Sequence, residues 1–225
     1  MLTSSMVECT ILENQKTKDV DTSLIGKLSG LLVFASVIPY ALRVYQRKIT
    51  PNITGWSVLT VVGLVLLVNY YESGAKENVW PAVAIFINAL LVTVLAFYHG
   101  TIERPDWFDI GCIVLSVIAL GLWLLFTKTP ISIPHASTLA LCVSIFADIV
   151  GTIPIFRAAI THPEKDRPFM WLLSALGYGI VVFAITDHTF ANYVVPVYMF
   201  FALLAIAYPL IVYRIKRRLP AREWI

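Results

Sequence analysis

Residues 38–56 of the chain read IPYALRVYQRKITPNITGW, and residues 153–171 read IPIFRAAITHPEKDRPFMW. Both segments begin with Ile-Pro and end with Trp, at an offset of 115 residues (153 minus 38). The same offset continues beyond them, so that four pairs of scarce residues agree: Pro39/Pro154, Trp56/Trp171, Pro81/Pro196 and Tyr98/Tyr213. This agreement predicts two copies of one unit, residues 28–99 and 143–214, in the same direction. Internal symmetry of this kind is common in membrane transporters.

The composition is that of an integral membrane protein. Of 225 residues, 58% are hydrophobic and 14% are charged, and the mean hydropathy is +0.78, whereas a soluble domain carries about 25% charged residues. The net charge of +3 arises mostly from the C-terminal tail and does not imply a nucleic-acid partner. The three cysteines form no CxxC pair, so no disulfide framework or metal site follows from them.

Seven apolar runs each approach the roughly 20 residues that a helix needs to cross a bilayer, and backbone hydrogen bonding in lipid favours helices. Two units that each cross three times in the same direction need one extra crossing between them, which the fourth run provides. We therefore expect an all-α integral membrane fold with seven transmembrane helices, in which two parallel three-helix bundles are joined by a linker helix (3+1+3). The runs are 24–46, 55–71, 79–98, 108–127, 136–160, 169–186 and 193–213.

Positive charges predict the orientation, because cytoplasmic loops of membrane proteins are rich in Lys and Arg. Of the 17 Lys and Arg residues, twelve fall on one face of the expected bundle and five on the other. The basic face is expected to be cytoplasmic, in a plasma membrane, with the N-terminus outside. The chain then divides into a mobile extracytoplasmic tail (1–23), a first repeat (24–99), a linker with the fourth helix (100–142), a second repeat (143–214) and a basic cytoplasmic tail (215–225).

This layout, with a proline in the first helix of each unit, resembles the SWEET and PQ-loop superfamily. That resemblance implies a transporter of a sugar-like or vitamin-like solute, although the superfamily also includes the ER-retrieval receptor. The Pro-Gln dipeptide is absent, since Tyr40 follows Pro39 and Ile155 follows Pro154. The chain is also similar to a family of bacterial inner-membrane proteins whose activity is not known, through Pro39-Tyr40, Pro51-Asn52, Trp56, Gly74, Asp148, Pro163-Glu164 and Pro196-Val197-Tyr198.

Asp148 is the strongest candidate for a substrate or proton site. It lies within the fifth apolar run, where an ionisable group costs on the order of 2.5–3.5 kcal/mol on insertion scales. Such a group is tolerated when it faces a water-filled cavity or a polar partner. The alternative is a structural hydrogen bond to a neighbouring helix through Thr152 or Ser144.

Asn88 in the third run and Asn69 in the second are candidate substrate-binding residues. SWEET transporters bind sugar through an asparagine on the third helix of each unit, so the resemblance implies this role for Asn88. Leu203 stands at the matching position of the second unit, which departs from that pattern. The alternative for both amides is a hydrogen bond across helices, which contributes about 0.6 kcal/mol on average.

Pro39 and Pro154 are candidate hinges, because a proline inside a helix removes a backbone donor and frees a carbonyl four residues earlier. Their matching places in the two units favour a pair of symmetric hinges for alternating access. The alternative is a static kink at each position.

Three charged residues are candidate gate residues. Arg157 follows Pro154 closely and is predicted either to pair with Glu164 or Asp166 or to extend to the cytoplasmic surface. Glu72 and Asp187 are related by the 115-residue offset at the outer helix ends. They are predicted to form an outer gate or to attract cations, with solvated loop charges as the alternative.

The tryptophans of the repeated segment, Trp56 and Trp171, are expected to be interfacial anchors, because tryptophan prefers that depth of the bilayer. Tyr98, Tyr213 and the neighbouring Arg214 have the same expected role.

We expect a carrier of a small polar solute that works by alternating access, with the lipid bilayer as its surroundings and a homo-oligomer as a possible form. The second hypothesis is a membrane receptor or scaffold on the same fold, which would use the basic tail. No HExxH, GxSxG, Walker or GxGxxG motif occurs, so neither an enzyme nor a cofactor or metal is expected.

Overall fold

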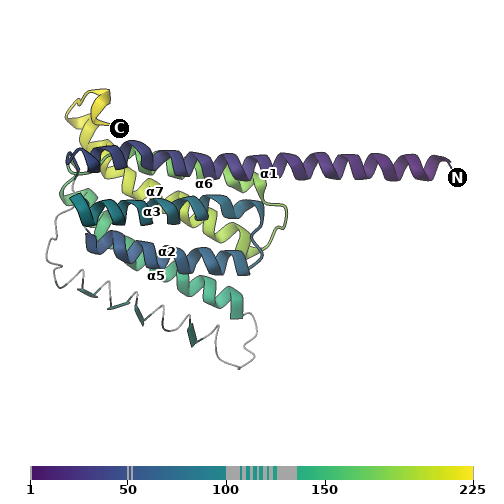
Figure 1. Cartoon of the computed structure of the whole chain (residues 1–225), viewed down its shortest axis with the longest axis horizontal. Helices are drawn as coiled ribbons and strands as arrows, with labels where there is room; N and C mark the ends of the chain where they lie inside the picture. Colours follow the sequence, from purple (N-terminus) through teal and green to yellow (C-terminus); the bar gives the residue numbers. More distant parts are fainter. Residues whose placement is uncertain are drawn as a thin grey trace.

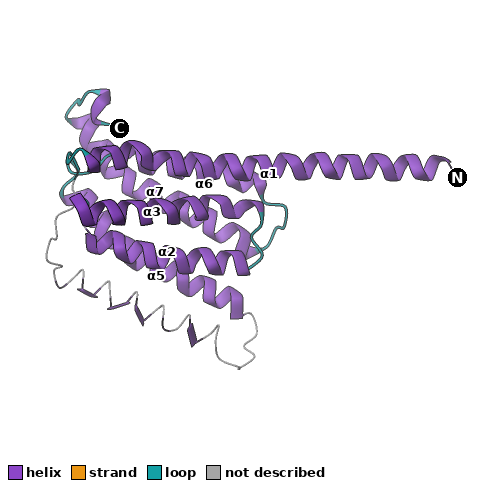
Figure 2. Cartoon of the chain, viewed as in Figure 1, coloured by secondary structure: helices purple, strands orange, loops and turns teal. Residues whose placement is uncertain are grey.

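The computed structural model describes residues 2–49, 51, 53–99 and 136–224, together with scattered positions between 107 and 125. Every regular element of this part of the chain is helical (Figure 2). The expected fourth helix, 108–127, lies largely outside the described residues. The long helices are α1 (Leu2–Tyr45), α2 (Ile53–Glu72), α3 (Trp80–His99), α5 (Ala136–Thr161), α6 (Pro168–Val181) and α7 (Phe190–Lys216), and the short 3-10 turns are η1 (Glu77–Val79), η2 (Val182–Ala184) and η3 (Ala221–Glu223).

Helix α1 begins much earlier than the apolar pattern predicts. It starts at Leu2, so the segment expected as a mobile tail (1–23) is almost entirely helical and projects beyond the bundle in Figure 1. No glycine or proline occurs before Gly26 to interrupt the helix. The part of α1 that is apolar enough to cross a membrane is Asp21–Tyr45.

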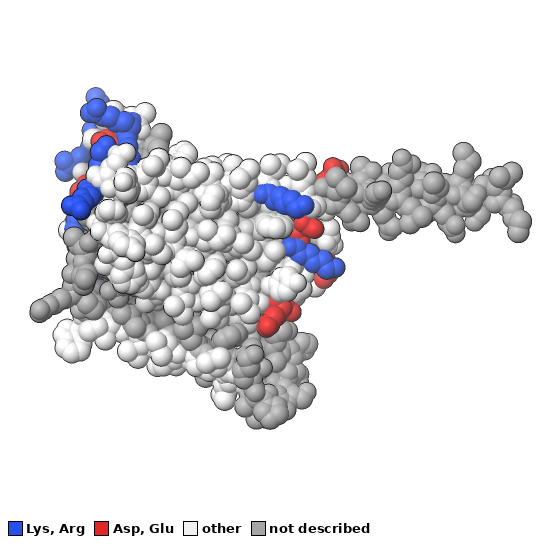
Figure 3. Space-filling model, viewed as in Figure 1, with Lys and Arg blue, Asp and Glu red and all other residues white. Residues whose placement is uncertain are grey.

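The surface of the bundle is that of a membrane protein. Five helical stretches of the described chain are long and apolar enough to cross a bilayer: Asp21–Tyr45, Gly55–Glu72, Glu77–His99, Thr138–Thr161 and Phe190–Lys216. A shorter apolar helix, Pro168–Ala184, accompanies them. Large apolar side chains such as Phe97 and Phe201 face outward, and an uncharged belt separates two charged ends (Figure 3). The protein is therefore an all-helical, multi-pass membrane-embedded protein.

The six long helices close into a ring. Helix α1 packs against α3 and α6, α2 packs against α3 and α5, and α7 packs against α5 and α6. The order around the ring is therefore α1, α3, α2, α5, α7 and α6, and in Figure 1 the helices run side by side along one axis. Residues that face the inside of the ring form the core, among them Val33, Val92, Met170 and Leu203.

The contact between α1 and α6 depends on small residues, which allow helix backbones to approach closely. A Cβ atom added at Gly177 would lie 2.5 Å from Val33 Cγ2 and 2.8 Å from the Ser29 carbonyl oxygen. One helical turn away, the hydroxyl oxygens of Ser36 and Ser174 are 2.8 Å apart and hydrogen-bonded. No larger residue than glycine fits at position 177 without moving the α1 backbone.

Candidate functional site

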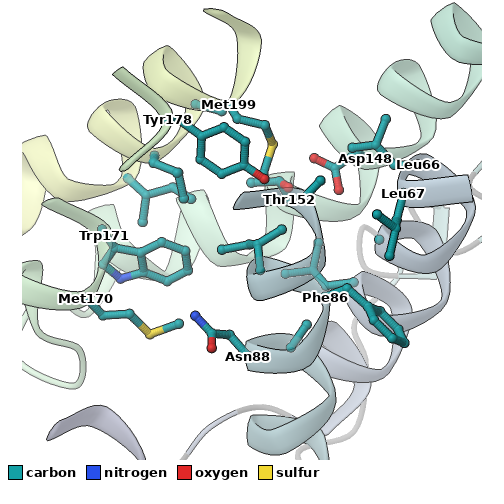
Figure 4. Close-up of a pocket in the computed structure, with 18 of the residues that line it drawn as sticks. Leu66, Leu67, Phe86, Asn88, Asp148, Thr152, Met170, Trp171, Tyr178 and Met199 are labelled. Carbon is teal, nitrogen blue, oxygen red and sulfur yellow. The ribbon is translucent and has the colours of Figure 1, made fainter. Parts of the chain in front are cut away.

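A cavity lies inside the ring of helices, between α2, α3, α5, α6 and α7 (Figure 4). The space in which the centre of a water molecule can move is about 60 Å³, several times the roughly 10–15 Å³ that one water requires. The lining residues are Trp56, Leu59, Gly63, Leu66, Leu67, Ala82, Ile85, Phe86, Asn88, Ala89, Asp148, Thr152, Met170, Trp171, Tyr178, Met199, Ala202, Leu203 and Ile206. Most of these side chains are apolar, so the few polar groups among them determine what the cavity can bind.

Asp148 lies midway along α5 and lines this cavity, with 7% of its surface exposed. The Tyr198 hydroxyl on α7 donates a hydrogen bond of 2.7 Å to its Oδ2 atom. An ionised carboxylate accepts about four hydrogen bonds, and Tyr198 provides one of them. Of the two residues named in the structural alternative, Ser144 donates to the Ala140 carbonyl of its own helix at 2.8 Å, and Thr152 lines the cavity.

Asn88 lies midway along α3 and also lines the cavity, with no exposed surface. Its Nδ2 atom donates a 2.7 Å hydrogen bond to the Val33 carbonyl oxygen on α1. Its Oδ1 atom is buried and has no hydrogen-bond partner. Since a buried acceptor without a donor is costly, this oxygen is a ready binding group for a donor inside the cavity.

Tyr178 on α6 is a cavity residue that sequence reasoning missed. Its side chain is 1% exposed, and its hydroxyl oxygen is buried without a hydrogen-bond partner. In Figure 4 this hydroxyl points toward the side of the cavity where Asp148 and Thr152 lie. The sequence shows only a tyrosine in an apolar run, and nothing in that pattern distinguishes it from a packing residue.

Asn69, a predicted substrate-binding residue, is not among the cavity-lining residues. It is 2% exposed, and its Nδ2 atom donates to the Val65 carbonyl at 2.9 Å and to the Ser144 hydroxyl at 2.7 Å. These contacts join α2 to α5. The geometry therefore supports the cross-helix alternative for Asn69.

The two tryptophans of the repeated segment stack on each other, and this differs from their expected position as interfacial anchors. Trp56 and Trp171 are only 5% and 3% exposed. Their ring centroids are 6.1 Å apart with an interplanar angle of 24°, and Tyr40 packs on Trp56 at 5.8 Å. Both tryptophans lie in the first turn of their helices, α2 and α6, so the pair covers the basic end of the cavity.

Arg214 organises the basic end of the bundle, and it too is buried rather than interfacial. It is 1% exposed and donates to four carbonyl oxygens. Its Nε atom reaches Glu223 at 2.6 Å, its Nη1 atom reaches Leu210 at 3.0 Å and Pro163 at 3.1 Å, and its Nη2 atom reaches Asp166. These bonds fasten the C-terminal segment and the turn between α5 and α6 to the end of α7.

Asp166 lies in the turn between α5 and α6 and contacts one tryptophan of the stacked pair. Its Oδ2 atom accepts a 3.0 Å hydrogen bond from the Trp171 indole, and its Oδ1 atom accepts one of 2.6 Å from the Arg167 backbone. Burial raises the pKa of Asp166 to about 6, although these two hydrogen bonds and the charges of Arg214 and Arg167 oppose the rise. The carboxyl group therefore links the tryptophan pair to the Arg214 network.

A second polar cluster, which sequence reasoning also missed, closes the opposite end of the bundle. The Tyr70 hydroxyl donates to the Asn192 carbonyl at 3.0 Å and accepts from Asn78 Nδ2 at 2.5 Å. All three residues are at most 4% exposed. The cluster joins the end of α2, the turn η1 and the start of α7.

The predicted gate residues lie away from the cavity. Glu72 at the end of α2 and Asp187 before α7 are both exposed and do not line the cavity. The Asp187 carbonyl accepts a 2.9 Å hydrogen bond from Asn192 Nδ2, so only its backbone contacts the cluster at that end. Arg157 is exposed on the last turns of α5, and Glu164 lies 3.5 Å from His162.

The predicted hinges, Pro39 and Pro154, lie inside α1 and α5, and neither ends its helix. Helix α1 continues to Tyr45 and α5 to Thr161. Both prolines are half-buried. Their position permits bending, because each helix lacks one backbone hydrogen bond there.

The fold and the cavity define a multi-pass helical membrane protein with a buried, carboxylate-containing cavity at mid-depth. Within the described residues, no group of three or more His, Cys, Asp or Glu side chains could hold a metal ion. A comparison with protein-family models found no match for this chain, and searches of curated proteins and of solved structures found none either. Function must therefore be argued from the cavity and the helix arrangement.

Proposed function

We propose that the protein is a carrier that moves a small polar solute across a membrane by alternating access. The observation that carries this proposal is the buried mid-depth cavity, whose carboxylate and unpartnered amide oxygen have no need to be there for packing alone. An intramembrane ionisable residue in such a cavity is characteristic of a substrate or ion pathway. The resemblance to SWEET and PQ-loop proteins favours a sugar-like or vitamin-like solute.

The two moving parts would be two parallel three-helix units joined by the fourth helix. The packing supports this division, because exchanging α1, α2 and α3 for α5, α6 and α7 leaves the pattern of neighbouring helices unchanged, although the α5–α7 contact is less extensive than the α1–α3 contact. The α1–α3 contact becomes α5–α7, α2–α3 becomes α6–α7, and α1–α6 becomes α5–α2. The stacked tryptophans, which the 115-residue offset relates, would meet near the axis of this exchange.

Each end of the bundle has a packed group that alternating access would open in turn. At the basic end this is the stacked pair of Trp56 and Trp171. At the other end it is the hydrogen-bonded cluster of Tyr70, Asn78 and Asn192. The basic end, at the left of Figure 3, would face the cytoplasm by the distribution of Lys and Arg.

Reconstitution into proteoliposomes tests the proposal. Uptake of a panel of sugars, vitamins, amino acids and amines is measured at pH 5.5 and pH 7.5 for the wild type, for Asp148→Asn and for Glu72→Gln. We expect saturable uptake of at least one solute, reduced at least tenfold by Asp148→Asn and unchanged by Glu72→Gln. Absence of flux for every solute, or equal flux in all three proteins, would contradict the carrier.

A receptor or scaffold is the second candidate, because the basic side chains of the folded tail face outward. Lys216, Arg217 and Arg218 are exposed, whereas Arg43 and Arg214 hold the tail through the carbonyl oxygens of Arg222 and Glu223. Exposed basic groups beside a membrane attract anionic lipid or acidic partners. Replacement of the exposed Lys216, Arg217 and Arg218 by glutamine separates the two functions and keeps the contacts of Arg214 and Arg43, since a scaffold loses its partner while a carrier retains uptake.

A further inference from the structure

The only ionisable side chain among the described cavity-lining residues that can carry a charge near neutral pH is acidic. Asp148 is an acid, and no Lys, Arg or His is among the residues that line the cavity in the described chain. On the face that Figure 3 shows, the described Lys and Arg side chains lie at the two ends of the bundle. An anion in the cavity would meet a carboxylate without a compensating cation, whereas a cation would neutralise it.

The cavity groups that have unused hydrogen-bonding capacity favour a ligand that donates hydrogen bonds. Asp148 presents a carboxylate that accepts one hydrogen bond from Tyr198 and has capacity for more. Asn88 Oδ1 is a buried acceptor with no donor, and its Nδ2 atom is already bonded to Val33. The Tyr178 hydroxyl, which is also unpartnered, can either donate or accept. The carboxylate and the amide oxygen can only accept, and an ammonium group supplies up to three N–H donors together with the complementary charge.

The rest of the lining suits an apolar body of small size. Aromatic faces of Trp171 and Tyr178 and the sulfur atoms of Met170 and Met199 border the space, and aromatic faces attract organic cations. The accessible space of about 60 Å³ is less than half of the roughly 150 Å³ that holds a benzene molecule in an engineered cavity. A hexose therefore exceeds this space, and an alkyl chain of a few carbons fits it better.

We propose that the solute bound in this cavity is a small protonated alkylamine, with its ammonium group on Asp148 and its alkyl chain against the apolar lining on the side of Tyr178 and Met199. The inference rests on the proposed carrier function for its biological meaning, and it replaces the sugar-like solute that the resemblance favours with a class that fits the size and charge of the cavity. Its test is a binding measurement that requires no transport.

The experiment is equilibrium dialysis of radiolabelled n-propylamine against the purified full-length protein in detergent. Unlabelled n-propylamine, 1-propanol and propanoate compete with it; the three share a carbon chain and differ in charge. Limits on binding energy per atom place the Kd for so small a ligand no tighter than tens of micromolar. We expect n-propylamine to compete at least tenfold better than 1-propanol, and propanoate not to compete.

Two variants locate the binding group. Asp148→Asn keeps the shape of the side chain and removes its charge, and we expect it to weaken n-propylamine binding at least tenfold. Glu72→Gln makes the same change at an exposed position and should leave the Kd within twofold of the wild type. If Asp148→Asn does not fold, the wild-type competition series alone decides the question.

The outcomes separate this inference from the carrier proposal. Equal competition by 1-propanol or propanoate, or no saturable n-propylamine binding up to about 10 mM, overturns the amine assignment, even if neutral solutes are transported. Selective amine binding without flux of any solute overturns the carrier and leaves the amine site standing. Wild-type affinity in a folded Asp148→Asn protein also overturns the assignment.

Discussion

Replacement of Gly177 by alanine should destabilise the protein, because the contact between α1 and α6 has no room for a methyl group. The added Cβ atom would lie 2.5 Å from Val33 Cγ2 and 2.8 Å from the Ser29 carbonyl oxygen. Val33 is fully buried, and its β-branched side chain has few rotamers to escape into. The Ser29 oxygen belongs to the backbone, so α1 itself must shift.

The magnitude follows from two opposing effects. Overpacking a well-packed interior costs typically about 1–3 kcal/mol, whereas replacing glycine by alanine inside a helix is favourable by about 1 kcal/mol. Gly63→Ala on α2 is the matched control, because a Cβ atom there has nothing within 4 Å. The free energy of unfolding of Gly177→Ala should therefore lie about 1–3 kcal/mol below that of Gly63→Ala.

Thermal melting of the detergent-solubilised proteins measures this difference. For a chain of this size, 1 kcal/mol corresponds to about 2–4 °C in melting temperature, so the two variants should differ by at least about 2 °C. Gly63→Ala should melt at or above the wild type and Gly177→Ala below it. Equal melting temperatures for the two variants would refute the close contact between α1 and α6.

Three further changes have expected outcomes. Arg214→Gln removes the bonds to four carbonyl oxygens. It should lower the free energy of unfolding by at least about 3 kcal/mol and accelerate hydrogen exchange in segment 219–224. The same change at the exposed Lys216 should alter neither the free energy of unfolding nor the exchange rate. The raised pKa of Asp166, about 6 instead of 3.8, means that the folded chain binds this proton more tightly than the unfolded chain. The free energy of unfolding should then fall as pH rises from about 4 to about 6. In Asp166→Asn, the melting temperature should vary less with pH across that range than in the wild type. Tyr70→Phe should lower the free energy of unfolding by about 1–3 kcal/mol, measured by denaturation, because two buried hydrogen bonds of the cluster of Tyr70, Asn78 and Asn192 are lost. An unchanged value would contradict a closing role for that cluster.

Five of the seven expected membrane-spanning segments correspond to helices long enough to cross a bilayer, because length and apolarity are properties of each segment alone. The run expected at 169–186 is a shorter apolar helix, Pro168–Ala184. The run expected at 79–98 corresponds to the span Glu77–His99, and the run at 136–160 corresponds to Thr138–Thr161. The start of α1 was not predictable in this way. Its first residues are polar, and only the absence of glycine and proline signals that the helix continues through them.

Residues whose role depends on another helix were harder to predict. Asp148 is conspicuous because a carboxylate in an apolar run is costly wherever it lies. Trp56 and Trp171 each have a strong individual preference for the bilayer interface, and their burial arises only because α2 and α6 bring them together.

Arg214 illustrates the same difficulty for a charged residue. A basic residue at the end of an apolar helix is normally an interfacial anchor. Its four acceptors come from α7 itself, the turn between α5 and α6, and the C-terminal segment. No local pattern indicates that these carbonyl oxygens converge on one guanidinium group.

Crosslinking across the stacked tryptophans tests alternating access most directly. In a background without native cysteines, Trp56→Cys and Trp171→Cys are joined by a short reducible crosslinker, and solute flux is measured in proteoliposomes before and after reduction. If the basic end must open in every cycle, flux should fall at least tenfold on crosslinking and return on reduction, while each single cysteine variant transports under both conditions. Undiminished flux through the crosslinked protein would show that solute does not pass between the tryptophans and would contradict the account.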